Sequence, residues 1–455
     1  MDFVPHTPTE EADMLAAIGV ARFDALLADV PASLRASARP ELPDGLSESE
    51  VWERLLALSE DNHGLISFRG VGCYDHYVPS VVPQLIGRSE FLTGYTPYQA
   101  ELSQGMLTTI YEYQSHIQRL TGFEVASASM YDGASALAEA ALMGLRVRGG
   151  SRVLISDGVN PRYREVVNTY LSGIGAELVP VPLSGGVTDA AALADLISDD
   201  TAAVLLSQPA FTGCIEDVAA LVAANKDAGG EKPPLVVVAA NPIALGVLQS
   251  PGDAGADICV GEGQPMGVAM GFGGPAVGFF ATRMMFVRQM PGRLVGRTRE
   301  LAGEGGEDSG KEGFCLTFQT REQHIRRERA TSNICSNQAL LALANTIYLS
   351  ALGPAGLANT ARLCHLRARQ LKDALCALPG WRPAFDGPFF HEFAVTPPVA
   401  PEMVNRHLLA HHFLGGADLG AYDDRWDGDM LFCATERRSE AQISALVSCL
   451  SGLPA

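Results

Sequence analysis

Lysine is nearly absent from this sequence of 455 residues. Of its 33 basic side chains, only four are lysines: Lys226, Lys232, Lys311 and Lys372. Any reaction that needs a lysine amine, such as Schiff-base formation with an aldehyde, must use one of these four. They stand at a helix end, in a Gly/Pro loop, in a polar segment and on a charged helix face, which are settings typical of solvated surface lysines.

Positive charge is scarce as well. The formal net charge is −19 at pH 7. Binding to duplex nucleic acid or to an anionic membrane needs clustered Lys and Arg, so the composition argues against both kinds of partner. Solubility alone is enough to explain the acidity.

Paired cysteines and targeting segments are also missing. The nine cysteines are dispersed without a Cys-x-x-Cys pair, which favours free thiols in a reducing cytosol over disulfides or a zinc site. The N-terminal stretch MDFVPHTPTEEADML has neither a basic n-region nor an apolar h-region. The longest apolar run, 235–248, is broken by Asn241 and Pro242 and is too short to span a bilayer. We therefore expect a cytoplasmic protein.

Motifs of other enzyme classes are incomplete. The sequence has no Gly-x-Ser-x-Gly elbow, which argues against a hydrolase. In the glycine-rich loop after residue 260, Met266 stands where a dinucleotide-binding fingerprint needs its third glycine. Cys73, Asp75 and His76 offer metal-ligating atoms, but a turn with a hydrogen-bonded histidine is the favoured interpretation.

Short apolar runs that alternate with amphipathic segments dominate the sequence from residue 151. They predict strands joined by right-handed helical crossovers, and hence a mostly parallel, doubly wound sheet covered on both faces. The expected strands are 153–156, 177–183, 202–208, 235–240, 257–260 and 277–280.

The pattern divides the chain into three parts. We predict an N-terminal helical segment (1–68), a large α/β domain (69–330) and a smaller C-terminal α+β domain (331–455). Thr7 and Ser47, each followed three residues later by a glutamate, predict capping boxes in the first part, and Gly353-Pro354 is predicted to separate two helices in the third. The polar, glycine-rich stretch 297–313 is expected to be irregular and mobile.

This layout is shared by many enzymes, pyridoxal-phosphate enzymes among them. Such a site needs a lysine for the Schiff base, an acid facing the pyridine nitrogen and a helix N-terminus for the phosphate. The segment 127–135, rich in small and hydroxyl-bearing residues before a helix, is a candidate for the phosphate element. A normally capped helix is the alternative.

The other two requirements are not met. The strand 235–240 ends in Ala239, Ala240 and Asn241, none of which can be an anion. The loop after the strand 257–260 has Gln264 and Pro265 where the lysine should stand. The sequence thus predicts a vacated cofactor pocket, shaped in part by the glycine-rich loop, and no catalytic lysine in this chain.

Six long strings of the sequence are distinctive: CYDHYVPSVV (73–82), EFLTGYTPYQAELSQG (90–105), ASMYDGASALAEAAL (128–142), GADICVGEGQPMG (255–267), GFFATR (278–283) and LTFQTREQHIRRERATSNICSNQALLAL (316–343). They resemble glycine dehydrogenase (decarboxylating), the P-protein of the glycine cleavage system, and in particular the alpha chain of its two-subunit form. The resemblance extends from the N-terminus to about residue 445.

The resemblance implies a pyridoxal-phosphate-dependent transferase type I fold and a heterotetramer of two alpha and two beta chains. It places the Schiff-base lysine, and with it covalent binding of pyridoxal phosphate, on the beta chain. The family reaction decarboxylates glycine and passes the aminomethyl group to the lipoyl arm of H-protein. A chain without its own lysine can still form one wall of its neighbour's active site.

Two segments are candidates for that wall. The first is the proline-stiffened stretch 95–104, which can present polar tips at an interface. Its candidate residues are Tyr95, Tyr98, Gln99, Glu101 and Gln104. The alternative is interface packing without contact to cofactor or substrate.

The second segment, 320–333, is rich in arginine and ends at Asn333. Its clustered cations can recognise a carboxylate or an acidic carrier protein, or can pair with neighbouring acids of this chain. The residues are Arg321, His324, Arg326, Arg327 and Arg329. The family often has lysine at the position of Arg329, and the change conserves the charge.

Two rival functions stay open from the sequence. A self-sufficient pyridoxal-phosphate enzyme would use one of the four lysines and absorb as a Schiff base without a partner. A pure scaffold for the beta chain would touch no active site, so changes such as Tyr95→Phe or Glu101→Gln would leave turnover unchanged.

Overall fold

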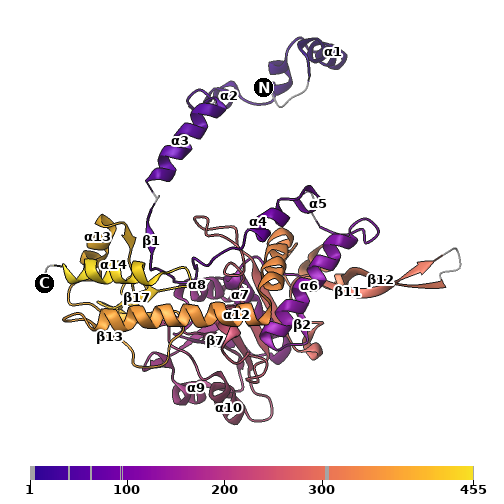
Figure 1. Cartoon of the computed structure of the whole chain (residues 1–455). Coiled ribbons are helices and arrows are strands. Elements are labelled where there is room, and N and C mark those ends of the chain that lie inside the picture. Colours follow the sequence, from indigo (N-terminus) through magenta and orange to yellow (C-terminus); the bar gives the residue numbers. More distant parts are fainter. Residues whose placement is uncertain are drawn as a thin grey trace. The chain divides into compact units, whose positions relative to one another are not determined.

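The computed structural model describes residues 6–38, 41–61, 64–92, 94, 96–302 and 307–453. The chain divides into two compact units, Met1–Gly64 and Leu65–Ala455 (Figure 1). The predicted domain boundaries at 68 and 330 stay predictions.

The first unit is helical. Thr7 and Ser47 each form a capping box with a glutamate three residues later, as the sequence predicts. Its helices are α1 (Pro8–Ile18), α2 (Ala32–Ser37) and α3 (Glu48–Glu60).

The second unit is built on a seven-stranded sheet of order β2-β10-β9-β8-β7-β3-β4. The run from β9 to β4 is parallel, whereas β10 pairs antiparallel with both β9 and β2. The predicted mostly parallel sheet is therefore confirmed. The strands are β2 (Val125–Ala126), β3 (Arg152–Ser156), β4 (Glu177–Val181), β7 (Thr201–Gln208), β8 (Leu235–Ala240), β9 (Ile258–Glu262) and β10 (Gly278–Thr282).

Helices cover both faces of this sheet because its central strands are apolar on both sides. Val204 and Leu206 of β7 lie in one core cluster, and the alternate Ala203 and Leu205 lie in another. The first cluster includes residues of α6, α9 and α10, and the second residues of α7 and α8. These helices are α6 (Gln104–Thr121), α7 (Gly133–Arg148), α8 (Pro161–Ser172), α9 (Ala190–Leu196) and α10 (Val218–Gly229).

A long helix, α12 (Ala339–Cys376), leads from the large sheet to the C-terminal part of the unit (Figure 1). It kinks at Gly353 (φ 62°, ψ −178°), next to Pro354, where the sequence predicts that one helix ends and another begins. By length and composition alone α12 could cross a membrane, but half of its most apolar window is buried inside the fold, as in a core helix.

The C-terminal part is the predicted α+β unit. Its sheet has the order β13-β14-β17-β16 and packs with α12, α13 and α14 around a core of its own. The elements are β13 (Arg382–Pro383), β14 (Glu392–Thr396), α13 (Pro401–Ala410), β16 (Ala417–Asp418), β17 (Met430–Cys433) and α14 (Glu440–Ser451).

Short elements connect these layers. A parallel pair joins the start of the second unit to its C-terminal part, and a small antiparallel pair follows β4. They are β1 (Ile66–Ser67) with β15 (Phe413–Leu414), β5 (Leu183–Ser184) with β6 (Val187–Thr188), and the helices α4 (Val81–Ile86), α5 (Ser89–Leu92) and α11 (Gln323–Arg326).

The expectation of an irregular segment at 297–313 is wrong. The chain forms a two-stranded antiparallel hairpin there, β11 (Leu294–Ala302) with β12 (Glu307–Thr317). Val295 and Leu316 pair across its base and pack into a cluster with α6. The polar composition of 297–313 predicted a loop because the apolar anchors of the hairpin, Val295 and Leu316, lie just outside this stretch.

Candidate functional site

Two adjoining cavities lie at the carboxyl ends of β7, β8 and β9, where ligands bind in open α/β sheets. The inner one measures about 80 Å³ and the outer one about 570 Å³. They share Gly72, Asn160, Tyr163 and Glu262 in their linings. The inner volume is far below the roughly 300 Å³ at which cofactor-sized pockets begin.

Gln264 and Pro265, which stand where a Schiff-base lysine would be expected, lie at this site. Pro265 lines the inner cavity and Gln264 the outer one. The Gln264 amide donates to the carbonyl oxygens of Tyr74 (3.0 Å) and Val268 (2.8 Å), and its Oε1 accepts from the Tyr74 N–H (3.0 Å). Gln264 therefore fixes two loops around the cavity.

Strand β8 ends without an acidic side chain, as the sequence predicts. Ala239, Ala240 and Asn241 line the inner cavity. The Asn241 Oδ1 accepts from the Ile243 N–H at 2.9 Å, which makes Asn241 the cap of the following turn. None of these side chains can hold a pyridine nitrogen protonated.

The helix N-terminus next to the cavities already carries carboxylates from this chain. Glu262 accepts the backbone N–H groups of Gly133, Gln264 and Val277, each at 3.0 Å. Gly133 is the first residue of α7, and the cap residue Asp132 accepts the Ser135 N–H at 2.7 Å. The segment 127–135 is thus a normally capped helix start, not a phosphate site, and a phosphate there would meet two acids.

These observations test whether pyridoxal phosphate fits this chain. All four lysines belong to the described part of the chain, and none lines either cavity. The inner cavity is too small, the acid for the ring nitrogen is missing and the anion position is taken by Glu262. The residues present do not fit the cofactor.

Glu392 lines the inner cavity, and no sequence motif predicts its role there. It stands at the start of β14, and its two oxygens accept from the Val71 N–H and the Tyr74 hydroxyl, both at 2.7 Å. Burial raises the pKa of Glu392 to about 7. A carboxyl that changes charge near neutral pH therefore links the loop 70–74 to the C-terminal sheet.

A buried polar cluster adjoins this group. His76 Nδ1 lies 2.7 Å from Glu436, and the Cys364 thiol donates to the same carboxylate at 3.2 Å. Burial opposes ionisation of Glu436, but the hydrogen bond and charge of His76 hold its pKa at about 2. Asp75 pairs instead with Arg438 at 2.7 Å.

Cys73, Asp75 and His76 therefore do not form a joint metal site. Cys73 is exposed, and the other two side chains bind different partners. The reading of a turn with a hydrogen-bonded histidine is confirmed. All nine cysteines are free, as their dispersal predicts.

The structure brings two of the predicted wall residues together. The Arg293 guanidinium donates to the Tyr98 hydroxyl at 2.8 Å and lies 4.7 Å from the centre of its ring. The His324 ring meets Tyr98 edge-on at 6.4 Å. Glu322 lies 3.5 Å from both Arg293 and His324, so it completes the cluster. Sequence reasoning missed Arg293 and Glu322, which carry no local motif.

The other wall candidates have different settings. Arg321 donates to the carbonyl oxygens of Met290 and Gly292, so its charge is directed into the fold. Gln104 binds the backbone of Phe314 in the hairpin through both amide atoms, at 2.9 Å each. Tyr95 lies outside the described residues. Gln99, Glu101 and Asn333 are exposed, and so are the remaining arginines of the second segment, Arg326, Arg327 and Arg329.

Comparison with known proteins agrees with this architecture. The model of the family described as glycine cleavage system P-protein matches residues 1–450. The chain belongs to the glycine cleavage system P-protein family. Curated relatives named "Probable glycine dehydrogenase (decarboxylating) subunit 1" include those of Moorella thermoacetica, 47% identical, and Desulforamulus reducens, 46% identical, each covering 100% of both chains.

Solved structures confirm the fold of this P-protein family member. A crystal structure of glycine decarboxylase (P-protein) of the glycine cleavage system, in inhibitor-bound form, matches with a TM-score of 0.89 and 43% identity over 100% of both chains. A glutamate decarboxylase of Lactobacillus brevis shares the fold with a TM-score of 0.67 at 14% identity, covering 94% of this chain and 95% of that one. The predicted pyridoxal-phosphate-dependent type I fold is confirmed.

Proposed function

We propose that this chain is the alpha subunit of a two-subunit glycine decarboxylase that acts only with its beta partner. Two alpha and two beta chains form the enzyme, and lipoylated H-protein receives the aminomethyl group of glycine. The full-length similarity to proteins named as subunit 1 supports this assignment.

The observation that carries the proposal is which side chains line the cavities at the sheet edge. In this chain the position of the cofactor is closed by Glu262, Gln264 and Asn241, each tied to backbone groups. A member of a decarboxylase family with such a pocket must rely on a second chain for the cofactor. Pyridoxal phosphate, bound covalently by the beta chain, supplies the electron sink for loss of the carboxylate.

The role of this chain is to complete the neighbouring site. In the Tyr98–Arg293–His324 cluster, Glu322 lies close to both Arg293 and His324, and Arg293 makes a cation–π contact with Tyr98. Tyr98 is 52% exposed, so its ring remains available to a partner while its hydroxyl is oriented from within. Such a surface can position the substrate and the lipoyl arm and exclude water from the partner's active site.

The test is exchange of labelled bicarbonate into the carboxyl group of glycine. The reaction contains this chain, its beta partner, lipoylated H-protein and pyridoxal phosphate, and is repeated with each protein omitted. We expect exchange only in the complete mixture. Absence of exchange in a mixture whose beta chain and H-protein are active with another alpha chain would refute the proposal.

A matched pair of variants separates an active-site wall from a scaffold. Tyr98→Phe removes the hydroxyl that Arg293 binds, and Glu165→Gln alters an exposed residue of α8 outside both candidate wall segments. We expect the first to lower the exchange rate and the second to leave it unchanged, with equal assembly of both in size-exclusion chromatography. Equal rates for both would favour the scaffold. The enzyme is proposed to work in the cytoplasm.

A further inference from the structure

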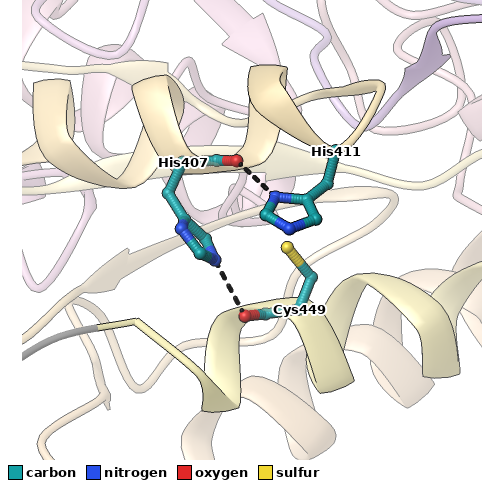
Figure 2. A group of neighbouring side chains, drawn as sticks. All are labelled: His407, His411 and Cys449. Carbon is teal, nitrogen blue, oxygen red and sulfur yellow. Dashed lines mark hydrogen bonds between the residues drawn. The ribbon is translucent and has the colours of Figure 1, made fainter.

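A second group of polar side chains lies in the C-terminal α+β part, outside the linings of both cavities. α13 carries His407 and ends at its C-cap residue His411, four positions later, and α14 carries Cys449 (Figure 2). One ligand atom from each residue lies within 4.8 Å of the others. Two imidazoles and a thiol are the donor set that zinc and related borderline-soft cations prefer.

The ring of His411 is already oriented for a metal. Its Nδ1 lies 2.9 Å from the carbonyl oxygen of His407. Because a carbonyl can only accept, the proton sits on Nδ1 and the lone pair of Nε2 is free. Metal-bound histidines in proteins usually have this arrangement, with the second ring N–H given to a carbonyl or carboxylate. Figure 2 shows the opposite edge of this ring facing the Cys449 sulfur.

His407 lies against the same cysteine. Its Nε2 is 3.0 Å from the Cys449 carbonyl oxygen, so this nitrogen already points at α14 (Figure 2). Metal binding requires that His407 release this carbonyl and carry its proton on Nδ1. Cys449 is half-buried, and its thiol must lose a proton to become a ligand.

We propose that His407, His411 and Cys449 bind one Zn²⁺ or a similar divalent cation, with water at the fourth position. The ion would join α13 to α14 across a helix pair that is otherwise linked by apolar packing and by the His407 bond to the Cys449 carbonyl. The site is independent of the proposed decarboxylase function, because its residues line neither of the two cavities.

A competing cluster exists within the chain. His76, Cys364 and Glu436 also place ligand atoms within 4.8 Å of one another. There, however, the Glu436 carboxylate already binds both His76 and Cys364, at 2.7 and 3.2 Å. A metal would have to break a buried ion pair, so this cluster is the weaker candidate.

The experiment measures Zn²⁺ binding to the full-length chain without a polyhistidine tag. The metal-free protein is titrated against a chromophoric zinc chelator, and Co²⁺ replaces Zn²⁺ in a parallel sample to report a thiolate-to-metal absorption band. The test variants are Cys449→Ser and His411→Gln. The controls are Cys376→Ser, a half-buried cysteine on α12 outside both clusters, and Cys364→Ser in the competing cluster.

We expect one Zn²⁺ per chain. Each test variant should bind more than about ten-fold more weakly, because one of three protein ligands is lost. Only Cys449→Ser should lose the cobalt–thiolate band, and both controls should bind like the wild type. Binding should strengthen as the pH rises from 6 to 8, roughly across the range in which imidazoles and a thiol give up protons to the metal.

Three results would overturn the proposal. They are no stoichiometric Zn²⁺ binding at pH 8, binding that survives both test variants, and binding that is lost in Cys364→Ser. His411 is exposed, so its variant keeps the test valid if Cys449→Ser fails to fold.

Discussion

Two carboxyl groups, those of Glu262 and Glu392, determine the charge and the hydrogen bonding of the cavities at the sheet edge. Glu262 satisfies three backbone N–H groups and so takes the place that an anionic ligand would need at the start of α7. Glu392 has two donors and is buried, and burial raises its pKa to about 7. Burial raises the pKa of Glu262 as well, but its three backbone donors oppose that shift by favouring the charged form.

Glu392 should make the stability of the protein depend on pH. Between its ordinary value of 4.5 and about 7 the unfolded chain has lost this proton and the folded chain retains it. The unfolded state then binds fewer protons, so the free energy of unfolding falls as pH rises through this window and levels off above it. The change amounts to about 3 kcal/mol.

Glu392→Gln should reduce this slope by the contribution of Glu392, because the amide does not ionise. The measurement is the urea midpoint at pH 5, 6 and 7, compared with the exposed control Glu165→Gln. The control should keep the slope of the wild type. An unchanged slope in Glu392→Gln would show that the carboxyl titrates in its ordinary range. Tyr74 and Cys433 also face this carboxyl, but both have pKa values raised by burial and stay neutral throughout the window.

Gly70 should not tolerate a side chain. A Cβ there would lie 2.1 Å from Glu392 Oε1 and 2.9 Å from the Tyr74 ring. The Tyr74 hydroxyl donates to the Glu392 carboxylate, so neither group can move aside without breaking this hydrogen bond. Gly70→Ala should therefore lower the free energy of unfolding by about 1 to 3 kcal/mol. Gly105→Ala is the control, since its Cβ would meet nothing within 4 Å. Denaturant unfolding of the two variants gives the comparison, and equal stabilities would contradict the expectation.

At the scale of elements, the hairpin β11–β12 depends on its attachment to α6. Val295 and Leu316 bury its base, and Gln114 exchanges hydrogen bonds of 2.9 Å with the backbone of Val295. Gln104, at the start of the same helix, does the same for Phe314. A two-stranded ribbon is marginal alone, so these anchors determine whether it stays in place.

Gln104→Ala should loosen the hairpin without unfolding the protein. The loss of two hydrogen bonds to Phe314 costs about 1 to 2 kcal/mol locally, which corresponds to exchange of the Phe314 amide that is faster by about ten-fold or more. Hydrogen exchange followed by mass spectrometry measures this, with Gln99→Ala as the control. Protection equal to that of the wild type would mean that the apolar base alone holds the hairpin.

At the scale of the whole molecule, the chain has the type I fold, and the residues at its sheet edge do not fit the cofactor. The four lysines of the chain lie on α10, in the following loop, on β12 and on α12, away from both cavities. Lys372 sits 4.5 Å from the centre of the Phe389 ring. The chain thus offers no lysine side chain at either of these two cavities.

Borohydride trapping checks this directly. The isolated chain, mixed with pyridoxal phosphate and reduced, should show no single labelled lysine peptide, whereas the mixture with the beta partner should be labelled on the partner. Peptide mapping by mass spectrometry provides the answer. A stoichiometric adduct on one lysine of this chain, abolished by its change to arginine, would refute the idea that the partner supplies the cofactor.

Local sequence was sufficient where a local interaction decides the structure. Capping boxes at Thr7 and Ser47, the kink at Gly353 and the alternating strands are read correctly because neighbours along the chain determine them. The hairpin was missed because its stability comes from contacts with α6, more than 180 residues away in sequence. Tyr98 and His324 were predicted as candidates in two separate segments, and only the packing around Arg293 brings them together.

The sequence by itself determined the fold class, the family resemblance and the absence of an acid and a lysine at the expected cofactor positions, because these depend on residue identity and on periodicity. The tertiary structure alone decided that Glu262 closes the helix N-terminus, that Glu392 titrates near neutral pH and that His407, His411 and Cys449 converge. Burial and the approach of groups distant in sequence are properties of the folded chain, and no local pattern encodes them.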